Sequence, residues 1–226
     1  MNIRIKIIDA IRTCAIFLMI FFHLSYDLAS FNYVTINFKL NPFWFYLPRL
    51  IVTLFFLSAG ASLYLAHGVG ALHWIKFFKR QLQLLFFSLM ISLATYFIFP
   101  QTWIYFGTLH SIFVCSFLTL PLLKFPRLAF ILGILMLIPP LFFGWRYPWP
   151  MLHHLSMDYI PALPWLGVMW IGIYLGQILY RYQNKLQKVE SLIPPFASFM
   201  GKHSLIIYLM HQPVLYGFLF LVSSLR

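Results

Sequence analysis

Four ionisable residues are spaced at helical intervals within one apolar segment near the start of the sequence, residues 7–31. They are Asp9, Arg12, His23 and Asp27. In a helix with about 100° per residue, the four side chains fall within about 60° of one another and form a polar stripe. Because ionisable groups are costly inside a membrane, the stripe predicts a surface that other helices cover, or a site.

The pair His23 and Asp27 could carry out acid–base chemistry. The two residues are four apart, so a carboxylate can touch the imidazole, fix its tautomer and favour its protonated form. Such a histidine can take a proton from an attacking hydroxyl or amine, or itself accept an acyl group. A buried ion pair that ties helices together is the alternative that these residues leave open.

Arg12 lies roughly 16 Å from His23 along the axis of the predicted helix. An arginine one turn inside a membrane span needs a partner. Asp9, three residues away, could form a salt bridge with it, and the phosphates of a cytosolic cofactor are the functional alternative. A cofactor whose phosphates stay near Arg12 could extend an acyl-bearing arm toward His23.

Other apolar segments contribute further histidine and aspartate residues. His110 begins the segment 106–123, Asp158 precedes the segment 160–181, and His211 lies within 203–223. Several such residues on separate helices indicate a site rather than one isolated helix–helix hydrogen bond. The sequence has no local ligand spacing such as HxxxH, so it predicts no metal site.

The composition is that of a polytopic membrane protein. Of 226 residues, 62% are hydrophobic and 9% are charged, and the mean hydropathy is +0.86. We predict one all-α domain over residues 1–226, a membrane helical bundle with about seven transmembrane helices. The predicted spans are 7–31, 48–67, 79–99, 106–123, 127–143, 160–181 and 203–223.

The distribution of basic residues predicts the orientation of the chain. Twelve of the 16 Lys and Arg residues lie at the N-terminal end and in the second, fourth and sixth connections. The other side has four: Lys39, Arg49, Arg146 and Arg226. The positive-inside rule therefore places the N-terminus in the cytoplasm and the C-terminus outside. The net charge is +12, and most of the basic residues lie outside the predicted spans or at their ends. Contact with lipid headgroups explains this charge better than binding to nucleic acid does.

Two outer connections are rich in aromatic residues, 41–46 and 145–150, and the second is followed by His153 and His154. An interfacial aromatic belt is one interpretation, and a platform on which a sugar ring stacks is the other.

Small residues cluster in two of the predicted spans. One group is the run 57–63, and the other is the pair Gly172 and Gly176. We expect close helix packing at both places, because small side chains let helix backbones approach.

The basic and aromatic stretch 74–80 leads into the third predicted span. It predicts an anchor at the cytoplasmic interface, and its cations could also hold the phosphates of a cytosolic cofactor.

Taken as a set, several of these motifs resemble the bacterial family of heparan-α-glucosaminide N-acetyltransferase catalytic domains. They run nearly from end to end of the chain and keep the family's order. The motifs are Ile8-Asp9-Ala-Ile-Arg12, Met19-Ile-Phe-Phe-His23-Leu-Ser-Tyr-Asp27-Leu28, Phe56-Leu-Ser-Ala-Gly-Ala-Ser62, Gly107-Thr-Leu-His110-Ser-Ile112, Asp158-Tyr-Ile-Pro-Ala-Leu-Pro-Trp165 and Gly201-Lys-His-Ser-Leu-Ile-Ile-Tyr-Leu-Met-His-Gln-Pro213. The chain departs from the family pattern at Thr13, where the family has glycine, and in the first outer connection, which contains no histidine.

The resemblance implies an acyltransferase that moves an acetyl group from cytosolic acetyl-CoA to a sugar or glycolipid at the outer side of a bacterial inner membrane. We expect the partners to be the bilayer, acetyl-CoA and a glycan or glycolipid acceptor, with a homodimer to be tested and no nucleic acid or metal. A small-molecule or proton-coupled transporter is the alternative, since transporters also have ionisable residues within their spans. The candidate residues are, for catalysis, His23, Asp27, His110 and Asp158; for the cofactor, Arg12, Arg4, Lys79 and Arg80; and for the substrate, Tyr26, His211 and Trp165.

Overall fold

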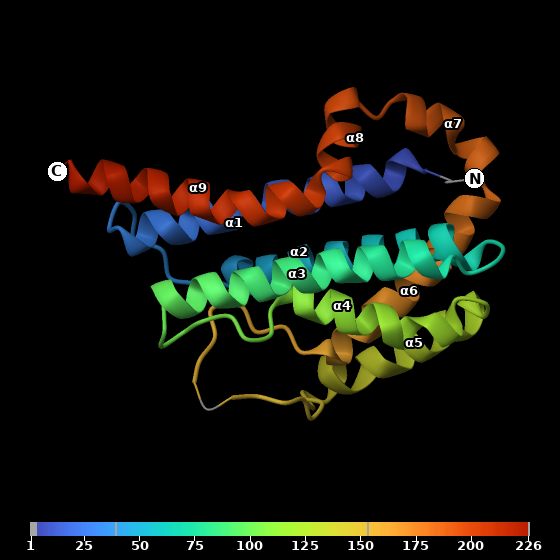
Figure 1. Ribbon diagram of the computed structural model, residues 1–226, viewed down its shortest axis with the longest axis horizontal. Coiled ribbons are helices and arrows are strands. Elements are labelled where there is room, and N and C mark those ends of the chain that lie inside the picture. Colours follow the sequence, from blue (N-terminus) through green and yellow to red (C-terminus); the bar gives the residue numbers. More distant parts are fainter. Residues whose placement is uncertain (1–3, 39, 153, 226) are drawn as a thin grey trace. The chain divides into compact units, whose positions relative to one another are not determined.

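A computed structural model describes residues 4–38, 40–152 and 154–225 of the chain. Lys39, His153 and Arg226 therefore lie outside the described residues. All regular secondary structure in the described part is helical, which confirms the predicted all-α class (Figure 1). The helices are α1 (Lys6–Ser30), α2 (Pro42–Leu63), the π-helix η1 (Tyr64–Gly68), α3 (Trp74–Ile98), α4 (Thr108–Thr119), the 3₁₀-helix η2 (Leu120–Leu122), α5 (Pro126–Phe142), α6 (Ala162–Arg181), α7 (Gln183–Ser191), α8 (Pro195–Lys202) and α9 (Ser204–Ser224).

Five helical segments in the described part of the chain are long and apolar enough to cross a membrane: Lys6–Ser30, Pro42–Gly68, Trp74–Ile98, Ala162–Arg181 and Ser204–Ser224. The two other predicted spans correspond to shorter apolar helices, Thr108–Leu122 and Pro126–Phe142. The 17 residues of α5 extend about 26 Å, somewhat less than the hydrocarbon thickness of about 30 Å.

The structure differs from the predicted spans mainly at three places. Helix α3 begins at Trp74 rather than at residue 79. Helix α2 begins at Pro42 rather than at residue 48, so most of the aromatic connection 41–46 is helical. Asn41 caps this helix, because its Oδ1 accepts a hydrogen bond of 2.9 Å from the backbone N–H of Phe43. Between the last two predicted spans, α7 and α8 form where no helix was expected.

The chain forms two compact units. Unit 1 comprises Met1–Ile5 and Phe56–Gln187, and unit 2 comprises Lys6–Phe55 and Lys188–Arg226. The prediction of a single domain over the whole chain stays a prediction.

In unit 1, α2 and α6 pack through small residues. A Cβ atom on Gly60 would collide with the backbone carbonyl of Met169, and one on Gly172 would collide with that of Leu57. A Cβ on Gly176 would lie 2.7 Å from the carbonyl oxygen of Ala61. These contacts confirm the close helix packing that the small residues predicted.

The contacts in unit 1 also define helix directions. Phe56 meets Trp165 and Ala61 meets Gly176, so α2 and α6 run parallel. Helices α3 and α4 run antiparallel, because their contacts pair residue 92 with 110 and residue 77 with 117. Helices α5 and α6 also run antiparallel, with residue 130 against 174 and residue 133 against 167.

In unit 2, α8 and α9 both pack on α1 (Figure 1). The hydroxyl of Thr13 donates a hydrogen bond of 2.6 Å to the carbonyl of Ala197 in α8. A Cβ on Gly201 would lie 2.5 Å from the Cα of Asp9, so only glycine allows this approach. Helix α9 runs parallel to α1, with residue 23 against 211 and residue 31 against 216.

Candidate functional site

Unit 2 contains a polar cluster between α1 and α9, which consists of His23, Asp27, His211 and Gln212. Asp27 is 2% exposed. The side-chain Nε2 of Gln212 lies 3.0 Å from Oδ1 and 3.1 Å from Oδ2 of Asp27, and donates to this carboxylate. The His23 and His211 rings lie 4.9 Å apart between centroids. We call these four residues the α1–α9 cluster.

A backbone hydrogen bond fixes the tautomer of His211. Its Nδ1 lies 2.6 Å from the carbonyl oxygen of Tyr208, which can only accept, so Nδ1 carries the proton. In the neutral ring Nε2 then has a free lone pair, and this atom is buried with no hydrogen-bond partner among the described residues. The α1–α9 cluster thus contains an acceptor nitrogen beside His23 that could take up a proton or bind a substrate N–H.

The sequence predicted that Asp27 would orient His23. In the structure the Asp27 carboxylate binds Gln212 instead, and within the described part of the chain no hydrogen bond joins it to His23. The two residues share one face of α1, but Asp27 turns toward α9, where the Gln212 amide offers a donor. The role of Gln212 could have been suspected from its position next to His211 in an apolar span.

The Asp27–Gln212 contact leads to a prediction about stability. Replacing Gln212 with Leu leaves a buried carboxylate without these hydrogen bonds, which we expect to destabilise the fold by about 2 kcal/mol. Thermal unfolding of the purified protein measures the change. The exposed Gln187 in α7 provides a matched control, Gln187→Leu, with little expected effect. An unchanged unfolding temperature in Gln212→Leu would contradict the contact.

Unit 1 contains a second polar group, where Asp158 binds the N-terminus of α4. Its Oδ2 accepts hydrogen bonds from the backbone N–H of Thr108 at 3.0 Å and from the Thr108 hydroxyl at 3.1 Å. Burial raises the pKa of the Asp158 carboxyl, and the two bonds from Thr108 act in the opposite direction. A Cβ on Gly107 would lie 2.6 Å from Oδ2, so the carboxylate fits closely against a glycine. The other oxygen, Oδ1, forms no hydrogen bond with the described residues.

His110 supports the same end of α4 through both ring nitrogens. Its Nδ1 accepts a hydrogen bond of 3.2 Å from the backbone N–H of Gly107. Its Nε2 lies 3.1 Å from the hydroxyl of Ser92, which itself donates to the carbonyl of Ile104 at 2.6 Å. Nε2 is therefore the donor to Ser92, and the neutral ring joins α3 to α4. His110 could exchange a proton only after one of these bonds breaks.

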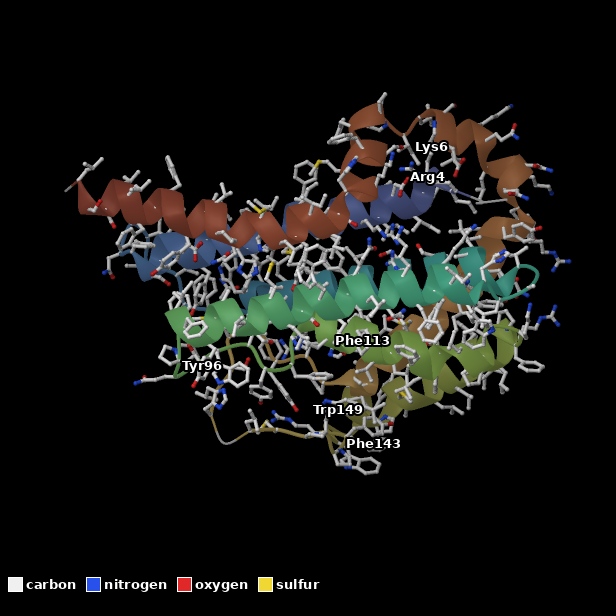
Figure 2. The ribbon with its side chains drawn as sticks, viewed as in Figure 1. Arg4, Lys6, Tyr96, Phe113, Phe143 and Trp149 are labelled. Atoms are coloured by element: carbon white, nitrogen blue, oxygen red, sulfur yellow. The ribbon has the colours of Figure 1, made fainter. Side chains whose placement is uncertain are left out.

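Aromatic rings gather beside Asp158 and His110 in unit 1. Trp149, labelled in Figure 2, follows α5. The centroid of its ring lies 5.4 Å from that of Phe106. His154 stacks on Trp103 at 5.5 Å and meets Tyr105 at 5.1 Å. The connection that follows α5 therefore contacts rings of the segment 103–106, which sequence reasoning did not single out, and both the belt and the platform stay predictions.

The other candidate residues are divided between the two units. Arg4, Lys79 and Arg80 belong to unit 1 and are exposed, whereas Arg12 belongs to unit 2 and is half-buried.

Two candidates for the substrate contact other rings. The exposed ring of Tyr26 lies 5.4 Å from that of Phe38, and Trp165 lies 5.9 Å from Phe56. Among the described residues, no group of three or more His, Cys, Asp or Glu side chains is arranged to hold a metal ion.

The helices of the described residues, with five apolar segments long enough to span a bilayer, indicate an integral membrane protein. The profile of the family described as heparan-alpha-glucosaminide N-acetyltransferase, catalytic, matches residues 4–213 of the 226. The chain therefore belongs to this family of membrane acetyltransferases, as the sequence motifs predicted. Searches of curated proteins and of solved structures found no match to the chain.

Proposed function

We propose that the protein transfers an acetyl group from acetyl-CoA at the cytoplasmic face to a sugar or glycolipid at the outer side of a bacterial inner membrane. The α1–α9 cluster carries this proposal, because it places an imidazole pair and a hydrogen-bonded carboxylate within the membrane helices of an acetyltransferase family member. Polar groups buried at membrane depth usually serve function.

In the proposed reaction His23 acts as the base. It takes the proton from an acceptor hydroxyl or amine while that oxygen or nitrogen attacks the thioester carbonyl. The new C–O or C–N bond forms, the C–S bond breaks, and the proton passes to the leaving thiolate. His211 lies beside His23 with a free Nε2, which can share the proton or bind the acceptor. Gln212 holds the Asp27 carboxylate in place through both of its oxygens, one helical turn from His23.

Unit 1 supplies the remaining candidates. We propose that Asp158 binds the acceptor through Oδ1, among aromatic rings that suit the apolar face of a sugar. His110 holds the end of α4 that carries the Asp158 contact. Single variants of these two residues show whether unit 1 takes part in transfer.

The phosphates of acetyl-CoA require cations on the cytoplasmic side. Our candidates are Arg12, Arg4, Lys79 and Arg80. Arg12 is the first to test, because a half-buried arginine within an apolar helix is costly unless an anion meets it. Arg12→Gln should weaken the binding of acetyl-CoA. If the variant binds acetyl-CoA normally, the role of Arg12 is structural.

Radiolabelled acetyl-CoA tests the proposed function directly. Purified protein is incubated with the labelled donor and an extract of membrane glycolipids, and released CoA and labelled lipid are measured. Release of CoA together with labelled lipid supports transfer. Uptake of label into proteoliposomes without cleavage of the thioester would instead indicate a transporter.

We also propose seven alternating spans with a cytoplasmic N-terminus. The helix directions within each unit support this arrangement, since it requires α1 parallel to α9, α2 parallel to α6, and α3 antiparallel to α4. The excess of basic residues on one side gives the orientation. We expect a C-terminal alkaline phosphatase fusion to be active in a Gram-negative host and a C-terminal green fluorescent protein to be dark. The opposite pair of results would contradict the orientation.

A further inference from the structure

Two buried polar side chains of unit 1 play no part in the mechanism above, Gln81 of α3 and His67 of η1. Gln81 is 2% exposed, and neither its Nε2 nor its Oε1 has a hydrogen-bond partner among the described residues. His67 is 4% exposed, and its buried Nδ1 has no partner there either. Burying such groups without partners is unfavourable, so their presence calls for a group that completes their hydrogen bonds.

Phe77 links the two positions, because it contacts His67 and lies one helical turn before Gln81. Its ring, which is 0% exposed, meets the imidazole of His67 edge-on at 5.7 Å between centroids. Gln81 follows Phe77 by one turn of α3, and both belong to the buried stripe of that helix. The ring of Phe117 in α4 meets the ring of Phe77 edge-on, with their centroids 5.2 Å apart. We call His67, Phe77 and Gln81 the π-helix cluster.

The backbone that carries His67 has an uncommon conformation. In η1 the N–H of Val69 donates to the carbonyl of Tyr64 at 3.2 Å, which is the five-residue spacing of a π-helix. This π-turn ends α2, because the next residue, Val69, has an extended backbone, and such turns occur at the C-termini of helices. The side-chain Nζ of Lys124 donates to the carbonyl of Gly68 at 3.4 Å and also to that of Gly70. This lysine therefore holds the end of the π-helix in place.

Positive charge surrounds the π-helix cluster. Lys76 and Arg80, both exposed on α3, act electrostatically on His67, and Lys124 binds the carbonyl next to it. The only acidic residue in the sequence of unit 1 is Asp158, which binds the N-terminus of α4. A ligand with an anionic head and an uncharged tail that has both hydrogen-bond donors and acceptors would match this arrangement.

We propose that the π-helix cluster binds the amide-containing arm of the acyl-CoA donor. Gln81 donates through Nε2 to an amide carbonyl of the arm and accepts an amide N–H at Oε1, and His67 completes its own hydrogen bonding with the arm. Lys76 and Arg80 meet the phosphates at the charged end. This inference rests on the proposed function, because it assigns a place to the donor that the function requires. Neither residue was among the candidates that the sequence suggested.

The test compares Gln81→Leu with Gln83→Leu, an exposed glutamine on the same helix. Calorimetry measures the affinity of the full-length protein in nanodiscs for acetyl-CoA and for adenosine 3′,5′-bisphosphate, which has the charged end without the arm. We expect Gln81→Leu to lower the affinity for acetyl-CoA about tenfold, as loss of hydrogen bonds to a ligand typically does. The affinity for the bisphosphate should stay unchanged. Gln83→Leu should alter neither affinity.

The stability of the ligand-free protein separates ligand binding from a structural role. Removing two unpaired buried polar atoms should raise the unfolding temperature of Gln81→Leu, whereas loss of a structural partner would lower it. Gln81→Met and His67→Leu serve as second variants. Both should lower the affinity for acetyl-CoA and leave the affinity for the bisphosphate unchanged.

Two results would contradict the proposal in different ways. Normal acetyl-CoA affinity in folded Gln81 and His67 variants would overturn this assignment and leave the proposed function intact. No acetyl-CoA binding by the unaltered protein would overturn both.

Discussion

Replacing His23 with Ala is expected to lower the rate of acetyl transfer by a factor of about 10²–10⁴, the usual contribution of a general base. Donor affinity should change little, since the cationic candidates for its phosphates lie elsewhere in the sequence. The fold should also persist, because the half-buried His23 side chain forms no hydrogen bond with the described residues and contacts its neighbours through ring packing. Transfer rate, CoA affinity and unfolding temperature are measured on the same preparations.

Three further variants make this test specific. Asp27→Asn should lower the rate less than His23→Ala, because it removes a charge near the base without deleting the base. His211→Ala removes the free Nε2 beside His23 and should also lower the rate. His203→Ala, at the N-terminal end of α9, is the control and should leave the rate unchanged. Full activity in His23→Ala would rule out His23 as the base, and loss of folding in both His23→Ala and Asp27→Asn would indicate a structural pair.

The helices of the fold could be predicted because the signals for them are local. The apolar segment of α1 and its polar stripe gave its limits to within one residue, Lys6–Ser30 against the predicted 7–31. The start of α2 was missed because its aromatic residues were assigned to an interfacial connection, although Asn41 and Pro42 form a typical helix start. Helix α8 was missed because its eight residues are too few to show a clear period.

The polar contacts of the candidate site could be predicted only in part. His23, Asp27 and His211 were identified because ionisable residues are rare in apolar segments. The pairing of Asp27 with Gln212 depends on how two helices 185 residues apart pack, and no local pattern contains that information. For the same reason the sequence did not single out Gln81, whose burial follows from the packing of α3 on α4.

The largest stability effect is expected at Gly60, where α2 meets α6 within unit 1. A Cβ at this position would collide with the backbone carbonyl of Met169 and would lie 3.2 Å from the backbone of Gly172. Neither neighbour is a flexible side chain, so even Gly60→Ala must push the two helices apart. We expect this variant to lower the free energy of unfolding by about 3 kcal/mol, which is typical of overpacking at a close contact.

Gly217 in α9 provides a control with the opposite expected sign. A Cβ there would meet no atom within 4 Å, so Gly217→Ala adds no collision. Because alanine favours a helix over glycine, the control should gain about 0.5–1 kcal/mol. Thermal unfolding of both variants in the same detergent compares them directly. Gly172→Ala adds a Cβ on the α6 side of this interface, where it would collide with the carbonyl of Leu57. It should therefore lower the stability as Gly60→Ala does. Equal stability of Gly60→Ala and Gly217→Ala would show that α2 and α6 do not approach this closely in the folded protein.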